Sequence, residues 1–96
     1  MKNFRKELNE RLKDPEYKKG FEIEKKRLEL SIKLAKAREE KGLSQGDLAK
    51  KANTTQQQVS RLETGFNSTI EAFINVAAAL DLDFQLVSKK KSKAAL

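Results

Sequence analysis

The chain of 96 residues contains no cysteine and no histidine. Disulfides, thiolate metal sites, cysteine nucleophiles and imidazole bases are therefore excluded. A cysteine-free chain fits a reducing, cytoplasmic compartment. No apolar run approaches the roughly 18 residues that a membrane span requires. The charged opening "MKNFRKELNERL" also lacks the apolar core of a signal peptide.

Groups suited to catalysis are scarce among the residues that remain. The sequence has no glycine-rich phosphate loop, and 96 mostly helical residues leave little room for a cleft. We therefore expect that the chain is not an enzyme and that it binds neither a cofactor nor a metal ion. The aromatics, five Phe and one Tyr, stand at core-like or partner-like positions. Because they form no stacking platform, an RNA-binding role is disfavoured.

The chain is strongly basic, with 21 Lys and Arg against 14 Asp and Glu, a formal net charge of +7. Such a surplus attracts polyanions, above all nucleic acid, although solubility alone would also account for it. Its placement is uneven, since residues 66–87 carry three acidic side chains and no basic one. That apolar, acidic stretch is predicted to supply core or subunit contacts.

A helical arm is predicted at the N-terminus, because Phe4, Leu8 and Leu12 recur every four residues from Asn3 onward. In the following "DPEY", Asp14 is predicted to cap a second helix that starts at Pro15. So few apolar residues would bury little against the rest of the chain. The arm is therefore predicted to be a surface for a partner, or else a mobile extension.

From residue 30 to residue 80 the pattern predicts short helices separated by Gly42, Asn53 and Gly65. The predicted N-caps are Ser44, in a capping box with Asp47; Thr55; and Ser68, in a capping box with Glu71. The side chains predicted to face inward are Leu30, Leu34, Ala37, Leu48, Ala49, Ala52, Val59, Leu62, Ile70, Phe73, Ala77 and Leu80.

The period changes to two after this region. Leu82, Phe84 and Leu86 alternate with their neighbours over residues 82–87, which predicts a short β-strand. A lone strand has no ladder partner in its own chain, so we expect a second copy to supply one across a two-fold axis. These three residues are thus predicted to form a homodimer contact. The closing "SKKKSKAAL" is predicted to be a solvated basic tail.

The stretch "TTQQQVSRLETG" carries the functional signal. Two short helices joined by a tight turn form a helix-turn-helix, whose second helix presents its N-terminal residues to base edges in the major groove. Gln56 and Gln57 occupy that leading turn, and Arg61 follows one turn later. Glutamine pairs with adenine and arginine with guanine, so these three are the predicted base readers.

"LAKAREEKGLSQGDLAKKANTTQQQVSRLETG" resembles the Cro/Xre-type helix-turn-helix family, over residues 30–80. The resemblance implies an all-α, five-helix domain that binds a palindromic operator in double-stranded DNA. It also implies a structural ion pair between Arg38 and Glu63. The residues that it places at the sugar-phosphate backbone are Gln45, Thr55, Gln58, Ser60, Asn67 and Ser68.

Several positions depart from the family pattern. Gly46 stands where a helix-favouring polar residue is usual, which weakens that helix or permits a close approach of backbone to DNA. Asn53 replaces the customary turn glycine, Thr54 replaces a buried aliphatic residue, and Asp81 replaces a frequent glycine. None of these positions is a predicted base reader.

The leading segment "LKDPEYKKGFEIEKKRLELSIKLAKAREEKG" resembles HigA-like antitoxins of bacterial type II toxin–antitoxin modules. That resemblance implies a dimer that represses its own operon and neutralises a small, basic ribonuclease toxin. The apolar residues of the arm expected to contact the toxin are Phe4, Leu8, Leu12, Tyr17 and Phe21. The alternative is a stand-alone phage-like or chromosomal repressor without a toxin partner, whose arm is a solvated extension.

The predicted organisation is a partner-binding arm over residues 1–29, a DNA-binding domain over residues 30–82, and a strand with a basic tail over residues 83–96.

Overall fold

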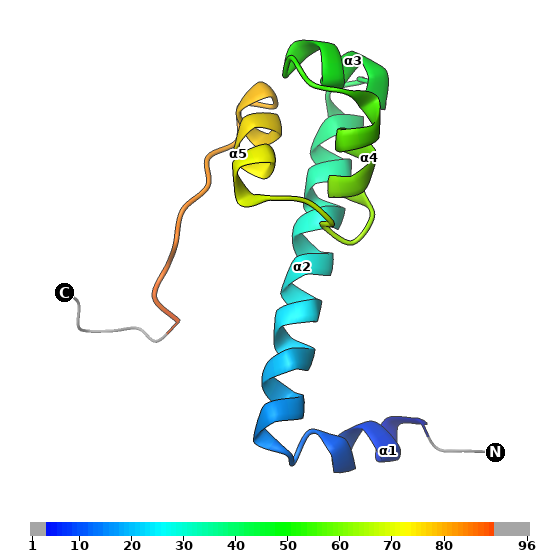
Figure 1. The fold of residues 1–96 in the computed structure, drawn as a ribbon, viewed down its shortest axis with the longest axis vertical. Coiled ribbons are helices and arrows are strands. Elements are labelled where there is room, and N and C mark those ends of the chain that lie inside the picture. Colours follow the sequence, from blue (N-terminus) through cyan, green and yellow to red (C-terminus); the bar gives the residue numbers. More distant parts are fainter. Residues whose placement is uncertain (1–3, 90–96) are drawn as a thin grey trace.

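Five helices and their connections make up the computed structural model, which describes residues 4–89 (Figure 1). They are α1 (Phe4–Arg11), α2 (Pro15–Glu40), α3 (Gln45–Lys51), α4 (Gln56–Glu63) and α5 (Ile70–Ala79). The predicted all-α class is therefore confirmed for the described part of the chain. No helix within residues 4–89 combines the length and apolar content of a bilayer-crossing segment.

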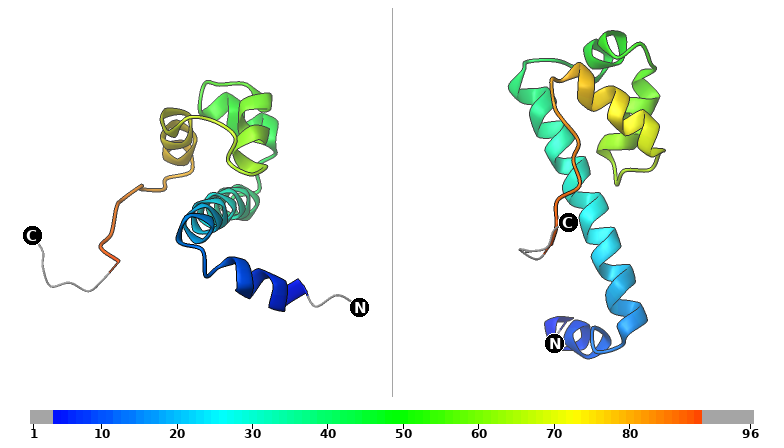
Figure 2. Two further views of the ribbon diagram at one scale, coloured as in Figure 1. Left: turned by 60° about the horizontal axis from the view of Figure 1, so that its bottom comes forward. Right: turned by 90° about the vertical axis from the view of Figure 1, so that its left-hand side faces the viewer.

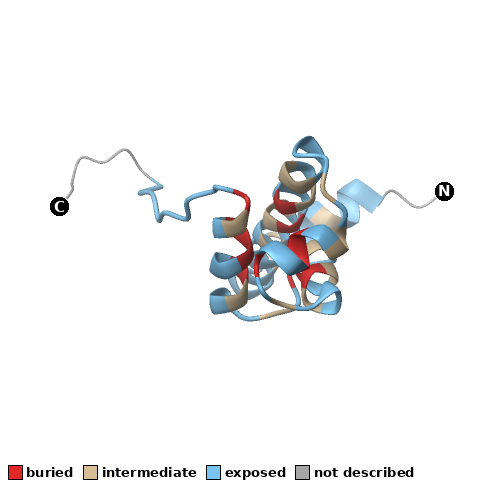
Figure 3. Cartoon of the chain, turned by 90° about the horizontal axis from the view of Figure 1, so that it is seen from above, coloured by how far each residue is buried: buried red, intermediate tan, exposed pale blue. Residues whose placement is uncertain are grey.

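The hydrophobic core lies where the C-terminal half of α2 meets α3, α4 and α5, and the buried residues gather there in Figure 3. Most predicted inward positions are buried, while Leu30 and Ala37 are partly buried at the edge of the core. The prediction for Ile70 is wrong, because its side chain is 52% exposed. Val76 is fully buried instead, since α5 packs its Phe73–Val76–Leu80 side against α3 and α4.

Helix α2 is one continuous helix of 26 residues and runs without a break past residue 29, the predicted end of the arm. Its C-terminal half packs on the core, and its N-terminal half projects away from the domain (Figures 1 and 2). Helix α1 has no buried residue and lies across the far end of α2. The projecting part holds apolar side chains that contact no core of their own.

Side-chain caps set the start of four helices. Asp14 accepts a hydrogen bond from the backbone N–H of Glu16, with Pro15 at the first helical position as predicted. The predicted box at Ser44 and Asp47 is complete in both directions. The backbone N–H of Ser44 also lowers the pKa of the Asp47 carboxyl, because the bond favours the charged form.

The cap of α5 differs from the predicted one. Thr69, not Ser68, is the N-cap, and its hydroxyl oxygen accepts from the backbone N–H of Ala72 at 3.1 Å. The predicted box of Ser68 with Glu71 is therefore wrong by one residue. The sequence "STIEA" offers two adjacent hydroxyls, and the second one starts the helix.

The predicted strand over residues 82–87 is not found in the single chain. The segment that holds Leu82, Phe84 and Leu86 is irregular, because no other strand exists within residues 4–89 to complete a ladder. Phe84 packs edge-on against Phe73 instead, with ring centroids 5.5 Å apart. After α5 the segment leaves the helical body and runs apart from α2 (Figures 1 and 2). Asn3 and most of the predicted basic tail lie outside the described residues.

Two of the family departures stand where the backbone is left-handed. Asn53 has φ +57° in the turn between α3 and α4, as its residue type predicted, and Asp81 has φ +62° directly after α5. At Asp81 this conformation lets Leu82 N–H reach Ala77 C=O at 2.9 Å, which closes the end of the helix.

The corrected cap of α5 can be tested by stability measurements. Thr69→Ala removes the acceptor for the Ala72 N–H and is expected to lower the free energy of unfolding by about 1 kcal/mol. Ser68→Ala is the matched control and should change it by a few tenths at most. Urea denaturation followed by circular dichroism measures both, and equal losses would mean that the cap is shared.

Candidate nucleic-acid interface

Helices α3 and α4 form a helix-turn-helix that is fixed by its apolar contacts. Leu48 of α3 and Val59 and Leu62 of α4 are all completely buried. Thr55 begins α4, since its side chain accepts from the backbone N–H of Gln58. With its inner face held in the core, α4 presents its leading turn to solvent.

The three predicted base readers share this outer surface. Gln56, Gln57 and Arg61 are exposed, and Gln57 and Arg61 stand one turn apart on α4. No hydrogen bond or ion pair within residues 4–89 engages their side chains. Their amide and guanidinium groups are thus available to an external partner with the donor and acceptor pattern of base edges.

Gly46 lies directly beside this surface. A Cβ placed on it would stand 3.5 Å from the Gln56 side-chain oxygen, an ordinary contact distance. Packing within the chain therefore does not demand a glycine here. The start of α3 and the start of α4 adjoin at Gly46, and the missing side chain leaves the α3 backbone open to a close approach.

A buried carboxylate at the end of α4 connects this helix to the rest of the domain. Glu63, at the end of α4, accepts from Arg38 Nε at 2.7 Å and from Arg38 Nη2 at 3.1 Å. The Glu63 side chain is 5% exposed and that of Arg38 is 14% exposed. The hydrogen bond to Glu63 raises the pKa of Arg38 further, so the guanidinium stays charged. This is the ion pair that the resemblance implied.

Arg38 and Glu63 each make one further bond that joins additional segments. Arg38 Nη1 donates to the backbone carbonyl of Leu43 at 2.7 Å, which fixes the turn before α3. Gln45 Nε2 donates to Glu63 Oε1 at 3.0 Å, so the first residue of α3 is joined to the last residue of α4. Three elements thus converge on one carboxylate.

This bond bears on the expected role of Gln45. Its side chain is half-buried and its amide nitrogen is directed to Glu63 rather than to solvent. A contact from that nitrogen to a phosphate requires release from Glu63. In this structure Gln45 positions α3 against α4, a role that its place in the sequence did not reveal.

The other residues expected at the DNA backbone surround α4. Thr55 and Asn67 are exposed, whereas Gln58, Ser60 and Ser68 are half-buried. Thr55 already accepts one hydrogen bond as the cap, which leaves its own hydroxyl hydrogen as a donor. Asn67 stands in the loop that follows α4, and its side chain makes no hydrogen bond within residues 4–89.

That loop is anchored by a residue that the sequence analysis missed. Phe66 adopts a left-handed backbone, φ +56°, yet its side chain is buried and packs on Phe73 with ring centroids 4.8 Å apart. Arg27 Nη2 donates to the Phe66 carbonyl at 3.3 Å, and Asn67 N–H donates to Arg61 C=O. A lone phenylalanine after Gly65 is the only signal of this anchor in the sequence.

Exposed lysines add positive charge around the helix-turn-helix. Residues 31–65 carry seven basic and four acidic side chains, while residues 66–87 carry none and three. The exposed members of the basic set on α2, at its C-cap and on α3 are Lys33, Lys36, Lys41, Lys50 and Lys51. The body that holds the predicted readers is therefore net positive, whereas α5 and the segment after it are net negative.

These features define a helix-turn-helix domain, with the buried Arg38–Glu63 ion pair behind an exposed α4. The helix-turn-helix family model matches residues 34–87, and the chain belongs to this family. It is accordingly a DNA-binding transcription regulator, and the family is not one of enzymes. No curated protein and no solved structure gives a significant match to the chain.

The Glu63 brace predicts a large stability effect. Glu63→Ala leaves Arg38 charged and largely buried without its partner, so the free energy of unfolding should fall by about 3–5 kcal/mol. Glu39→Ala is the matched control, because Glu39 is 67% exposed and only 3.9 Å from the same guanidinium. Chemical denaturation measures both variants, and a small effect at residue 63 would refute the brace.

Proposed function

We propose that the protein is a sequence-specific transcriptional repressor that acts as a homodimer on a palindromic operator. The observation that carries this proposal is the leading end of α4, where Gln56, Gln57 and Arg61 are exposed and unpaired within the described chain. Bidentate side chains in that position suit adenine and guanine edges in the major groove. A two-fold dimer would meet half-sites about 34 Å apart, one helical turn.

The proposed phosphate contacts would hold α4 in register. Asn67 and Ser68 in the anchored loop, Thr55 at the cap, and Gln58 and Ser60 along α4 lie around the predicted readers. Contacts of this kind fix orientation but carry no sequence information. The exposed lysines would add a salt-dependent attraction that is common to all sequences.

We further propose that the protein is the antitoxin of a type II toxin–antitoxin module and neutralises a small, basic ribonuclease. The projecting α1 and the N-terminal half of α2 support this proposal, because their apolar side chains lack a core. Phe4 is 75% exposed and Tyr17 is 37% exposed, while Leu8, Leu12 and Phe21 are partly covered. An apolar helical surface of this kind fits the groove of a partner protein.

Acidic side chains on the same arm favour a basic partner. They are Glu7, Glu10, Glu16, Glu22 and Glu24, and all are exposed. Complementary charges of this kind raise association rates and select among partners. The second candidate, a stand-alone repressor of phage-like or chromosomal type, shares the DNA-binding half but gives the apolar arm no partner.

The base-reading assignment predicts a loss of specificity. Gln56→Ala and Gln57→Ala should each weaken operator binding by about 1–3 kcal/mol and leave binding to unrelated DNA nearly unchanged. Lys36→Ala is the control for a phosphate contact, since it should weaken all sequences alike and reduce the salt dependence.

Fluorescence anisotropy with the selected operator and a scrambled duplex measures both quantities over a range of salt. Equal losses on the two duplexes for the glutamine variants would show that these side chains do not read bases.

The antitoxin assignment predicts that the two activities separate. Deletion of residues 1–20 should abolish neutralisation of the toxin and leave operator affinity intact, because the helix-turn-helix core lies entirely after residue 30. The control is Ile74→Asp on α5, far from the arm, which should preserve neutralisation. Growth of cells that co-express the protein with its candidate toxin reports neutralisation. A truncated protein that still rescues growth would refute the role of the arm.

A further inference from the structure

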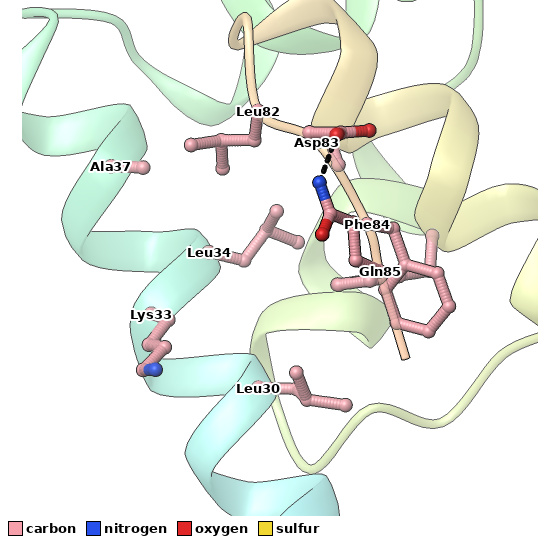
Figure 4. Close-up of a pocket in the computed structure, with 10 residues that line it drawn as sticks. Leu30, Lys33, Leu34, Ala37, Leu82, Asp83, Phe84 and Gln85 are labelled. Atoms are coloured by element: carbon pink, nitrogen blue, oxygen red, sulfur yellow. Dashed lines mark hydrogen bonds between the residues drawn. The ribbon is translucent and has the colours of Figure 1, made fainter. Parts of the chain in front are cut away.

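An apolar hollow of about 330 Å³ opens between α2, α5 and the segment after α5 (Figure 4). Leu30, Leu34 and Ala37 of α2 form one wall, and Leu82 and Phe84 form the other. Lys33, Asp83 and Gln85 also line it, and the Gln85 amide donates to the Asp83 carboxylate at 2.8 Å. The chain does not fill this space with any described side chain.

Two aliphatic side chains follow the wall of the hollow directly. Leu86 is 91% exposed and Val87 is 82% exposed, the two most exposed large apolar side chains in the described part of the chain. Residues 83–87 make no backbone hydrogen bond within the described chain. The segment after α5 runs away from the domain (Figure 1), and neither Leu86 nor Val87 is among the residues that line the hollow.

An apolar hollow and an apolar projection thus adjoin on one surface. A patch of this composition is self-complementary across a two-fold axis, because each copy offers a projection to the hollow of the other. Like charges do not oppose this arrangement, since the edge of the hollow carries one basic side chain, Lys33, and one acidic one, Asp83. A second copy of the chain is therefore the occupant that the surface fits best.

We propose that Leu86 and Val87 of each protomer insert into the hollow of the other, so that the two copies exchange C-terminal segments. The inference rests on the homodimer of the proposed function and names the surface that forms it. It does not need a β-ladder, because the contact is made by side chains in an apolar hollow. It also assigns Leu82 and Phe84 to the receiving wall rather than to the inserted part.

The inference can be tested with the full chain by sedimentation equilibrium. Leu86→Asp and Val87→Asp should each weaken the dimer by about 100-fold or more, since every substitution removes two buried aliphatic contacts per dimer. Ala37→Phe, which fills the hollow from α2, should dissociate it as well. The matched controls are Leu28→Asp on α2 and Ile74→Asp on α5, which are 53% and 47% exposed and lie outside the hollow.

A cross-linking experiment tests the pairing itself in this cysteine-free chain. Protein with Leu86→Cys mixed with protein with Lys33→Cys should form a disulfide-linked heterodimer on mild oxidation, because residue 33 lines the hollow. Ile74→Cys mixed with Lys33→Cys is the control and should not. This result does not depend on whether Ala37→Phe folds.

A dimer that survives Leu86→Asp but dissociates with Ile74→Asp would overturn the inference in favour of the exposed face of α5. A wild-type chain that is monomeric at all concentrations yet binds a half-site would overturn it and leave the DNA-binding function intact. A wild-type dimer that binds no operator would instead refute the proposed function.

Discussion

The hydrogen-bonded contacts of the Glu63 carboxylate are the interaction on which the rest of the domain depends. Glu63 ends α4, is almost fully buried, and accepts hydrogen bonds from Arg38 on α2 and from Gln45 on α3. A charge in so dry a place is tolerated only when it is paired and its lone pairs are satisfied, and here three N–H groups satisfy it. The same Arg38 also donates to the Leu43 carbonyl in the turn before α3. The contacts of Arg38 and Glu63 therefore hold α3 and α4 in a fixed relative orientation. The leading end of α4 can then carry unpaired polar groups without loss of order.

The polar and the apolar parts of the surface lie on different elements of the molecule. Around α4 the exposed groups are amides, a guanidinium and lysines, and the apolar side chains point inward. Along α1 and the projecting half of α2, and again after α5, apolar side chains reach solvent alongside the charged ones. Exposed apolar groups at the two ends of a small chain favour association with proteins, whereas the polar face favours nucleic acid. The acidic and apolar stretch after residue 66 fits this division, since negative charge there keeps that face away from phosphate.

Local sequence signals gave the correct helices wherever one residue type had one physical role. Pro15 after Asp14, Ser44 with Asp47, and Thr55 before the glutamines each started a helix as predicted, because a cap is settled within four residues. The signals failed where neighbours compete or where pairing is not local. Two adjacent hydroxyls, Ser68 and Thr69, are equivalent in sequence, and in the structure the second one caps α5. The alternating residues 82–87 read as a strand, but alternation cannot create the neighbouring strand that a ladder needs.

The sequence by itself determined the helical class, the positions of most caps, the buried stripe of the motif and the three residues that face outward on α4. These follow from period, capping and residue chemistry, which act over a few positions. Only the tertiary structure decided that Gln45 points to Glu63, that Phe66 anchors the loop through Phe73 and Arg27, and that α2 projects beyond the core. It also decided that a hollow opens beside Phe84. Each of these depends on residues from distant parts of the chain. Such residues meet only when the core packs, so no local pattern in the sequence reveals their contacts.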